Sequence, residues 1–363
     1  MKRNSGLQLD GDLREKLFTL ISIKYAISGG TEVKREDFLY EHVVHMELRP
    51  GMTVNQLVQE FGKSGSFGAG RLSTACDIFE GMIRDEQCTI FLAVAGAVVP
   101  AGLRTVIADL IRKRLIDALV STGANIVHDL IEALGGHHYK GHWVVDDFLL
   151  YKYHIFRIYD IFVPEEDFVK ADKAMIDMFD EIARERGGHT FSTPELMREV
   201  GSRLSDSTSI LRAAYEANVP VFLPAIRDSE FAFIYRTHLE RNPTSGSIKV
   251  DSFKEIPEMI EIADRSPHLG MMVIGGGVPR NAVQHVALMA GKGMDYAVVI
   301  TMDRPETGGL SGSTIEETVS WGKVKKRADK VMVIGDALII FPMMVSAVLE
   351  RLGEEFKRRA SSP

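Results

Sequence analysis

Short apolar runs that alternate with amphipathic helical patterns constrain the fold of this chain most. Most of the runs are unbroken, which is typical of strands covered on both faces. They are Thr89–Val94, Ile116–Val120, Arg157–Val163, Val219–Leu223, Gly270–Ile274, Tyr296–Thr301 and Val331–Ile334. The helical patterns between them include Leu103–Arg114, Ile126–Leu134, Glu166–Arg186, Thr193–Asn218 and Asp251–Arg265. This order predicts an α/β fold with a doubly wound, mostly parallel sheet and helices on both faces.

Residues 1–80 differ in character from the rest of the chain. They are more charged and rich in helical patterns, and a glycine-rich stretch, GKSGSFGAG, interrupts them at 62–70. We expect an N-terminal helical arm and linker over 1–80 and the sheet domain over 81–363. No internal repeat is visible in the sequence, which sets repeat architectures aside.

Composition excludes several classes of protein. A formal net charge of −7 and a pI near 5.9 argue against nucleic acid as a partner. The two cysteines, Cys76 and Cys88, are too few for a disulfide framework and suit a reducing cytosol. The N-terminus lacks the apolar segment of a signal peptide, and the longest apolar run, 90–103, is too short to span a bilayer. We therefore expect a cytoplasmic protein with no membrane segment.

Small residues and aspartates gather where the predicted strands end. Parallel sheets bind ligands at this edge, because helix N-termini and tight turns expose backbone N–H groups there. Glycine lets a flat or phosphorylated ligand approach the backbone, and aspartate can bind ribose hydroxyls. The residues of this rim are Gly96, Thr122, Gly123, Asp228, Gly275, Gly276, Gly277, Met302, Asp303, Asp336 and Ala337. Together they predict a dinucleotide site.

Each rim motif also has a simpler interpretation. The glycines at 275–277 do not complete GxGxxG, because Arg280 stands where the third glycine belongs, so they could form a plain strand-to-helix turn. Asp336 could equally cap the following helix. The GKS triplet at 62–64 is no phosphate loop, since Leu57 occupies the position of the required glycine. The recurrence of glycine turns and acids at strand after strand favours the site.

Lys323 is the candidate nucleophile, although its surroundings also allow a plain surface role. It follows Trp321 and opens a basic run over 325–327, and such runs usually form solvated faces. Desolvation or nearby positive charge would instead make the amine nucleophilic by lowering its pKa from about 10.4. Trp321 could supply an apolar wall or a π face, and Glu317 could hold an ammonium group or accept a proton. The glycine-rich stretch 303–314 before them suits a substrate lid.

The sequence around Lys323 resembles the deoxyhypusine synthase family. The segment EETVSWGKV carries the resemblance together with IGGGVP before it, GDALIIFPMMV after it, and CTIFLAVAGAVVPAGLR and IDALVSTGA near the front. The similarity runs from about residue 50 to the C-terminus. Members of the family are NAD-dependent homotetramers with a Rossmann-like core, and an N-terminal arm of each chain reaches a neighbouring active site. They oxidise spermidine, carry its aminobutyl group as an imine on the SWGK lysine, and pass it to a lysine of a translation-factor precursor.

The resemblance implies a role for each candidate residue. Lys323 would carry the imine, Trp321 would pack on the polyamine, and Glu317 would bind or deprotonate it. NAD would be the cofactor, and no metal is expected. The NAD site would be lined by Gly275, Gly276, Gly277, Asp228, Thr122, Gly123, Asp336 and Ala337, which already belong to the predicted rim.

The chain departs from the family at the cofactor and polyamine sites. Where members read AGGxEED after the second strand, Val127 and His128 replace the two acids, and 95–97 reads AGA in place of TSN. Asn281 stands where the family has a histidine, and His285 follows one turn later. We expect Asn281 and His285 to contact the substrate, in a divergent branch that keeps the lysine and alters the amine pocket.

Two further substitutions and the other histidines complete the comparison. Phe233 and Leu310 align with substrate-binding aspartates of the family. His128 could be a general base or a ribose contact at the rim, although a capping or packing role fits it equally. The histidines of GGHHYKGH at 135–142 lack the acid or cysteine spacing of a metal site, which favours a polar loop.

These observations predict an NAD-dependent aminobutyl transferase. Two alternatives remain open at this stage. One is transfer to a free diamine, as in homospermidine synthase. The other is a nucleotide-binding relative that keeps the fold and has lost catalysis along with its carboxylates.

Overall fold

The structure is a computed structural model that describes residues 35, 39, 41–242, 246–354, 356 and 358. The chain divides into two units, Met1–Val44 and His45–Pro363, and the helices and strands named below belong to the second. The second unit begins well before residue 80, so the helices of residues 54–84 are part of it. Nearly half of the proposed arm (residues 1–34, 36–38 and 40) and the N-terminal segment considered as a signal peptide lie outside the described residues.

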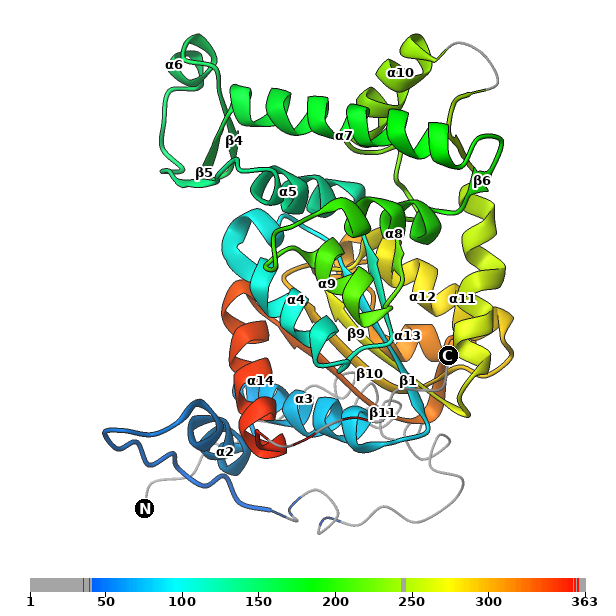
Figure 1. Ribbon diagram of the computed structural model, residues 1–363. Helices are drawn as coiled ribbons and strands as arrows, with labels where there is room; N and C mark the ends of the chain where they lie inside the picture. The colour runs from blue at the N-terminus through cyan, green and yellow to red at the C-terminus, as the bar shows by residue number, and fades with distance from the viewer. Residues whose placement is uncertain are drawn as a thin grey trace, which may run out of the picture. The chain divides into compact units, whose positions relative to one another are not determined.

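Six parallel strands form the central sheet (Figure 1). They are β1 (Cys88–Val94), β2 (Ala118–Ser121), β7 (Val221–Phe222), β9 (His268–Ile274), β10 (Met294–Thr301) and β11 (Val324–Ile334). Their order across the sheet is β7-β2-β1-β9-β10-β11, and every pairing is parallel. This is the strand order of the Rossmann fold, with its switch point between β1 and β9. The predicted doubly wound, mostly parallel sheet is confirmed.

Helices cover both faces of the sheet. They are α2 (Val54–Ser64), α3 (Phe67–Arg84), α4 (Arg104–Arg112), α5 (Gly123–Ala133), α6 (Asp147–Lys152), α7 (Glu165–Glu185), α8 (Thr193–Arg203), α9 (Ile210–Ala217), α10 (Phe231–Arg241), α11 (Glu255–Asp264), α12 (Gly277–Met289), α13 (Ile315–Ser320) and α14 (Ala337–Leu352).

Alternate residues of β1 face two separate cores, which is why the sequence of the strand is an unbroken apolar run. Ile90 and Leu92 belong to the core under α2, α3, α4 and α14, whereas Phe91 and Ala93 belong to the core under α11 and α12.

Three predicted elements differ from the structure. The run at 157–163 is not part of the central sheet: β4 (Ile155–Ile158) and β5 (Ile161–Pro164) pair with β3 (Tyr139–Lys140) in a separate antiparallel sheet. The pattern at 193–218 is two helices, because Ser209 starts α9 by accepting a hydrogen bond from Arg212 N. The last strand begins at Val324 rather than Val331, so the basic run lies on β11.

The remaining short strands and segments frame the sheet. β6 (Thr190–Phe191) and β8 (Lys249–Val250) pair with each other outside it. The glycine-rich stretch at 62–70 connects two helices, and Gly65 adopts a left-handed conformation (φ 63°) between them. Among the described helices, none is both long and apolar enough to cross a bilayer.

Candidate active site

The turns that follow β1 and β9 meet at the switch point of the sheet. Gly275 has φ +77°, and a Cβ at this position would lie 2.8 Å from the carbonyl oxygen of Ala95. Glycine is therefore required for the two turns to approach each other. A Cβ on Gly276 would lie 2.5 Å from Cα of Ser311, so the segment after β10 also passes close to this turn. Gly277 begins α12, and no side chain caps that helix.

The turns after β2 and β7 form the second part of the rim. Thr122 caps α5 by accepting a hydrogen bond from Asn125 N at 3.4 Å. A Cβ on Gly123 would lie 2.3 Å from Oγ of Ser229, so the β2–α5 turn packs against the turn that contains Asp228. Asp228 itself is exposed. A pocket of about 470 Å³ lies beside this turn, and both Arg227 and Val278 line it.

The other predicted rim residues are exposed except for the half-buried Ala337, and some have local partners. Gly96 adopts φ +84° with open space around it, and Met302 is exposed. Asp303 accepts a hydrogen bond from the Ser311 hydroxyl. Asp336 accepts a hydrogen bond from Leu338 N at 2.8 Å, which is the capping role, and Ala337 is the first residue of α14.

Lys323 lies in the turn between α13 and β11, away from the rim. Its carbonyl oxygen accepts a hydrogen bond from Met294 N at 3.0 Å, which places its backbone at the amino-terminal end of β10. Its side chain is only 7% exposed. Its Nζ donates to Oδ1 of Asn281 at 3.1 Å and lies 5.6 Å from the centroid of the Trp321 ring. The solvated-face interpretation fails for Lys323 and holds for Lys326, which is exposed.

The surroundings of Lys323 favour its neutral amine. Burial lowers its pKa, and the positive charge of Arg280 lowers it further. Burial also lowers the pKa of His285, with the charge of Lys323 as the second cause. Glu317 lies exposed in the first turn of α13, and its charge acts on Arg280. A lowered pKa increases the fraction of the amine that is neutral and therefore nucleophilic.

Three of the predicted catalytic and substrate residues therefore come together around this amine. Asn281 and His285 lie one turn apart on α12, and Trp321 offers its ring to the amine while remaining 64% exposed. The indole can thus face the amine and an incoming ligand at once.

His128 is not part of this group. Its Nδ1 lies 2.9 Å from Nε2 of His138, whose own Nδ1 lies 2.7 Å from Oε1 of Glu132. Its ring meets that of Phe168 edge-on. Burial, with a further contribution from His138, lowers the pKa of His128 to about 4. Among the described residues, no hydrogen bond or ring contact joins His128 to Lys323, and its surroundings match the packing interpretation.

Arg280 is the functional candidate that sequence reasoning missed. It appeared there only as the residue that breaks the glycine motif, yet it is fully buried beside the Lys323 site. The available signal was its place on the buried face of α12, three and seven residues before Val283 and Ala287. A lone charge on an apolar helix face requires an explanation.

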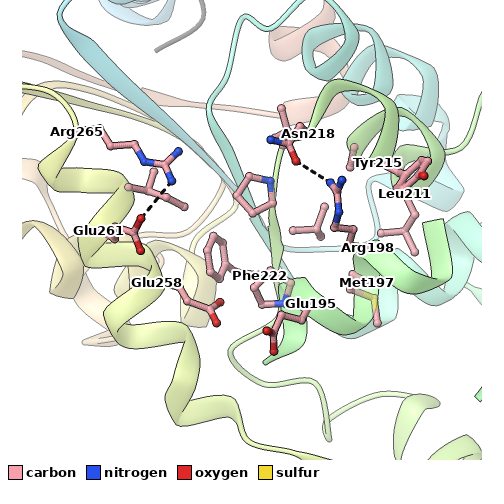
Figure 2. A pocket seen from close by; sticks show the side chains of 16 residues that line it. Glu195, Met197, Arg198, Leu211, Tyr215, Asn218, Phe222, Glu258, Glu261 and Arg265 are labelled. Atoms are coloured by element: carbon pink, nitrogen blue, oxygen red, sulfur yellow. Dashed lines mark hydrogen bonds and ion pairs between the residues drawn. The ribbon is translucent and has the colours of Figure 1, made fainter. Parts of the chain in front are cut away.

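Figure 2 shows a different pocket, of about 270 Å³, beside the edge strand β7. Residues of α8, α9 and α11 line it, and Glu195 and Glu258 are among them. Arg198 is held there by Asn218 and Arg265 by Glu261. None of the predicted site residues lines this pocket, so it is not the candidate active site.

Comparison with known proteins identifies the family. The family model described as deoxyhypusine synthase matches residues 56–348. A chain of Methanosarcina acetivorans named probable deoxyhypusine synthase 1 is 43% identical over 85% of this chain and 94% of its own length. A chain of the same name from Archaeoglobus fulgidus is 39% identical over 86% of this chain and 99% of its own.

A solved structure agrees at the level of the fold. The crystal structure of a chain described as a deoxyhypusine synthase, from Entamoeba histolytica, superimposes with a TM-score of 0.62 at 20% identity. It covers 85% of this chain and 97% of its own. The match of the family model and the identity to the two archaeal chains decide the assignment: this chain belongs to the deoxyhypusine synthase family.

Proposed function

We propose that this chain is an NAD-dependent aminobutyl transferase. It would take the aminobutyl group of a polyamine such as spermidine and pass it to a lysine of a translation-factor precursor. The observation that carries the proposal is the buried amine of Lys323, held by the neutral amide of Asn281 and facing the indole of Trp321. Family membership supports the reaction class.

The rim residues fit NAD. The N-terminus of α12 has no side-chain cap, and a Cβ on Gly277 would meet open space. A pyrophosphate would bind there, because backbone N–H groups attract negative charge. Asp228 and Asp303 are exposed at strand ends and would bind ribose hydroxyls. Thr122, Gly123 and Ala337 would border the cofactor. When bound, NAD would accept a hydride from the amine donor and return it after transfer.

The side chains around Lys323 would perform the transfer itself. Asn281 would orient Nζ, which adds to the oxidised carbon of the donor as the remaining diamine leaves. The resulting imine joins Lys323 to the four-carbon amine. Glu317 would accept the proton released from the attacking amine, and Trp321 would pack on the methylene chain. The acceptor lysine then displaces Nζ, and Lys323 returns as the free amine.

We also propose that the protein assembles as a homotetramer, as other members of the family do. The support within this chain is a set of aromatic side chains around the β3-β5-β4 sheet. Trp143, Phe148, Tyr151 and Tyr159 are between 58% and 86% exposed, and such apolar surface marks a contact with another chain.

Transfer to a free diamine is a second candidate, favoured by the altered acids. Val127 is buried in the core, and His128 is engaged with His138. Neither replaces the carboxylates that the family uses to bind ammonium groups. With fewer carboxylates, the pocket would hold the three ammonium groups of spermidine less tightly, and a diamine such as putrescine, which has two, would compete for the site.

The test is to follow spermidine labelled in its aminobutyl group, with NAD present, in three parallel reactions. One receives the translation-factor precursor, one receives putrescine and one receives no acceptor. We expect the label on the precursor protein. Label recovered only in a larger polyamine would select the diamine transferase. Absence of transfer in all three reactions, with NAD still bound, would select the nucleotide-binding relative.

A further inference from the structure

Arg280 is a buried cation without an anionic partner. It lies in the first turn of α12 and is fully buried. Its Nη1 donates to Leu310 O at 3.0 Å, and its Nη2 donates to Ser313 O at 3.0 Å. Its Nε has no hydrogen-bond partner among the described residues, and carbonyl oxygens accept hydrogen bonds from a guanidinium without neutralising its charge. Buried charges are otherwise paired with an opposite charge, so this arrangement has a cost that needs a reason.

No carboxylate compensates that charge by direct contact. Among the described residues, no ion pair reaches Arg280, and Glu317 acts on it only at a distance. Gln284, one turn further along α12, is also fully buried but neutral, and its amide has no hydrogen-bond partner among the described residues. The positive charge of Arg280 therefore acts on the ionisation of neighbouring side chains.

The most important neighbour is Lys323. Asn281, the residue directly after Arg280, accepts the hydrogen bond from Lys323 Nζ. Among the described residues, the charge of Lys323 acts on His285 of the same helix, and the charge of Glu317 on α13 acts on Arg280. Lys325, the next basic residue on β11, is paired with Asp295 on β10 at 2.7 Å. The amine thus faces a neutral acceptor and a buried cation, whereas a carboxylate acceptor would have stabilised its charged form.

We propose that Arg280 is a positioning residue that makes Lys323 nucleophilic in two ways. Its buried charge disfavours the ammonium form of Lys323, because two like charges close together in a partly dry site repel each other. Its guanidinium also fixes the 310–313 segment against α12, and that segment leads directly into α13, Trp321 and Lys323. This inference deepens the proposed function, since it states how the amine of that site becomes reactive.

The test measures the reactivity of Lys323 without cofactor or polyamine. The full-length protein is treated with a small neutral aldehyde and cyanoborohydride across a pH series, and mass spectrometry follows the adduct on the Lys323 peptide. We expect the adduct on Lys323 of Arg280→Gln to form about five-fold more slowly than in the unaltered protein near neutral pH, with the profile displaced to higher pH. Arg280→Lys, which keeps the charge, should retain the original profile. Exposed Lys326 is the internal control and should be labelled equally in all three proteins.

Each outcome decides the proposal. An Arg280→Gln variant that folds and labels Lys323 with the unaltered profile would overturn it. If Arg280→Gln does not fold, Arg280→Lys carries the test, and displacement of its profile to higher pH would equally overturn the proposal. Because the aldehyde requires neither NAD nor a polyamine, the result is independent of whether the chain transfers aminobutyl groups. A fast, charge-dependent Lys323 in a protein that fails every transfer assay would refute the function and leave this inference standing.

Discussion

At the scale of residues, Asp129 joins three segments of the fold. It is fully buried in α5 and accepts hydrogen bonds from Arg104, from the Ser209 hydroxyl, and from the backbone N–H groups of Ile210 and Leu211. It thus balances the charge of Arg104 and satisfies the N-terminus of α9, where a negative charge is favoured.

Replacing Asp129 should destabilise the protein strongly. We expect Asp129→Ala to lower the free energy of unfolding by about 3 kcal/mol or more, because the Ser209 hydroxyl and two backbone donors would stay buried with no acceptor. Arg104 would keep Asp206 as its only carboxylate partner among the described residues. Urea unfolding monitored by circular dichroism measures the change. Asp109→Ala is the matched control: Asp109 forms an exposed ion pair with Arg112, and its loss should cost at most about 1 kcal/mol. Equal losses in both variants would contradict the role of Asp129.

His128 should make stability depend on pH. Its pKa in the folded protein is lowered to about 4, so between that value and its unfolded value near 6.5 the unfolded chain binds the extra proton. The contribution of His128 to the free energy of unfolding is fully present above about pH 6.5. It is lost as pH falls toward about 4, and the loss amounts to at most about 3 kcal/mol. Glu255 makes stability depend on pH in the opposite sense, because burial raises its pKa to about 7 and its contribution therefore favours the folded state at lower pH. Glu255 is present in both the His128 variant and the unaltered protein, so the difference between their pH dependences reports on His128 alone.

The measurement is urea unfolding of His128→Gln and of the unaltered protein at several pH values. The variant should lose less stability on acidification. His142→Gln removes an exposed histidine and should reproduce the unaltered pH dependence. Parallel curves for all three proteins would show that His128 is not held in its neutral form.

Sequence could identify Lys323 but could not show its burial. The basic run at 325–327 looks like a solvated face because β11 starts at Val324, where exposed and buried positions follow each other closely. Arg280 and Lys323 approach each other because residues 310–323 pack along α12. No local sequence pattern predicts this tertiary packing. His128 was predicted near the rim because it follows Thr122 closely in the sequence. Its contact with His138 joins residues ten positions apart and depends on how the chain turns between them.

At the scale of elements, strands were predictable and their neighbours were not. Unbroken apolar runs marked the central strands because both faces of the sheet are covered. The run at 157–163 has a similar composition but belongs to the partly exposed β4–β5 hairpin. The division between α8 and α9 depends on the cap at Ser209, whose serine was hidden within an apparently continuous helical pattern.

Asp336 allows the capping role and the cofactor role to be separated at the N-terminus of α14. Asp336→Ser keeps an oxygen that can accept the hydrogen bond from Leu338 N, whereas Asp336→Ala removes it. We expect Asp336→Ala to lose about 1 kcal/mol of stability and Asp336→Ser to lose almost none. If the carboxylate also borders the cofactor, both variants should bind NAD several-fold more weakly by isothermal titration calorimetry. Unchanged NAD affinity in Asp336→Ser would reduce Asp336 to a helix cap.

At the scale of the whole molecule, the two halves of the candidate site lie on different parts of α12. The rim is at the carboxyl ends of the strands, beside Gly277 at the start of the helix. The Lys323 backbone is at the amino-terminal end of β10, and its side chain reaches Asn281 on the second turn of the helix. The rim was predicted from the glycines and aspartates that follow successive apolar runs in the sequence, whereas the meeting of Lys323 with α12 could be anticipated only from the family resemblance.

The central claim is that the amine of Lys323 takes the four-carbon amine from an oxidised donor. The most direct measurement is mass spectrometry of the Lys323 peptide after the full-length protein has been incubated with spermidine and NAD and then reduced with borohydride. We expect one aminobutyl group on Lys323, formed only when NAD is present and absent from Lys323→Arg. An unmodified Lys323 in protein that has bound both NAD and spermidine, or an adduct on another lysine, would contradict it.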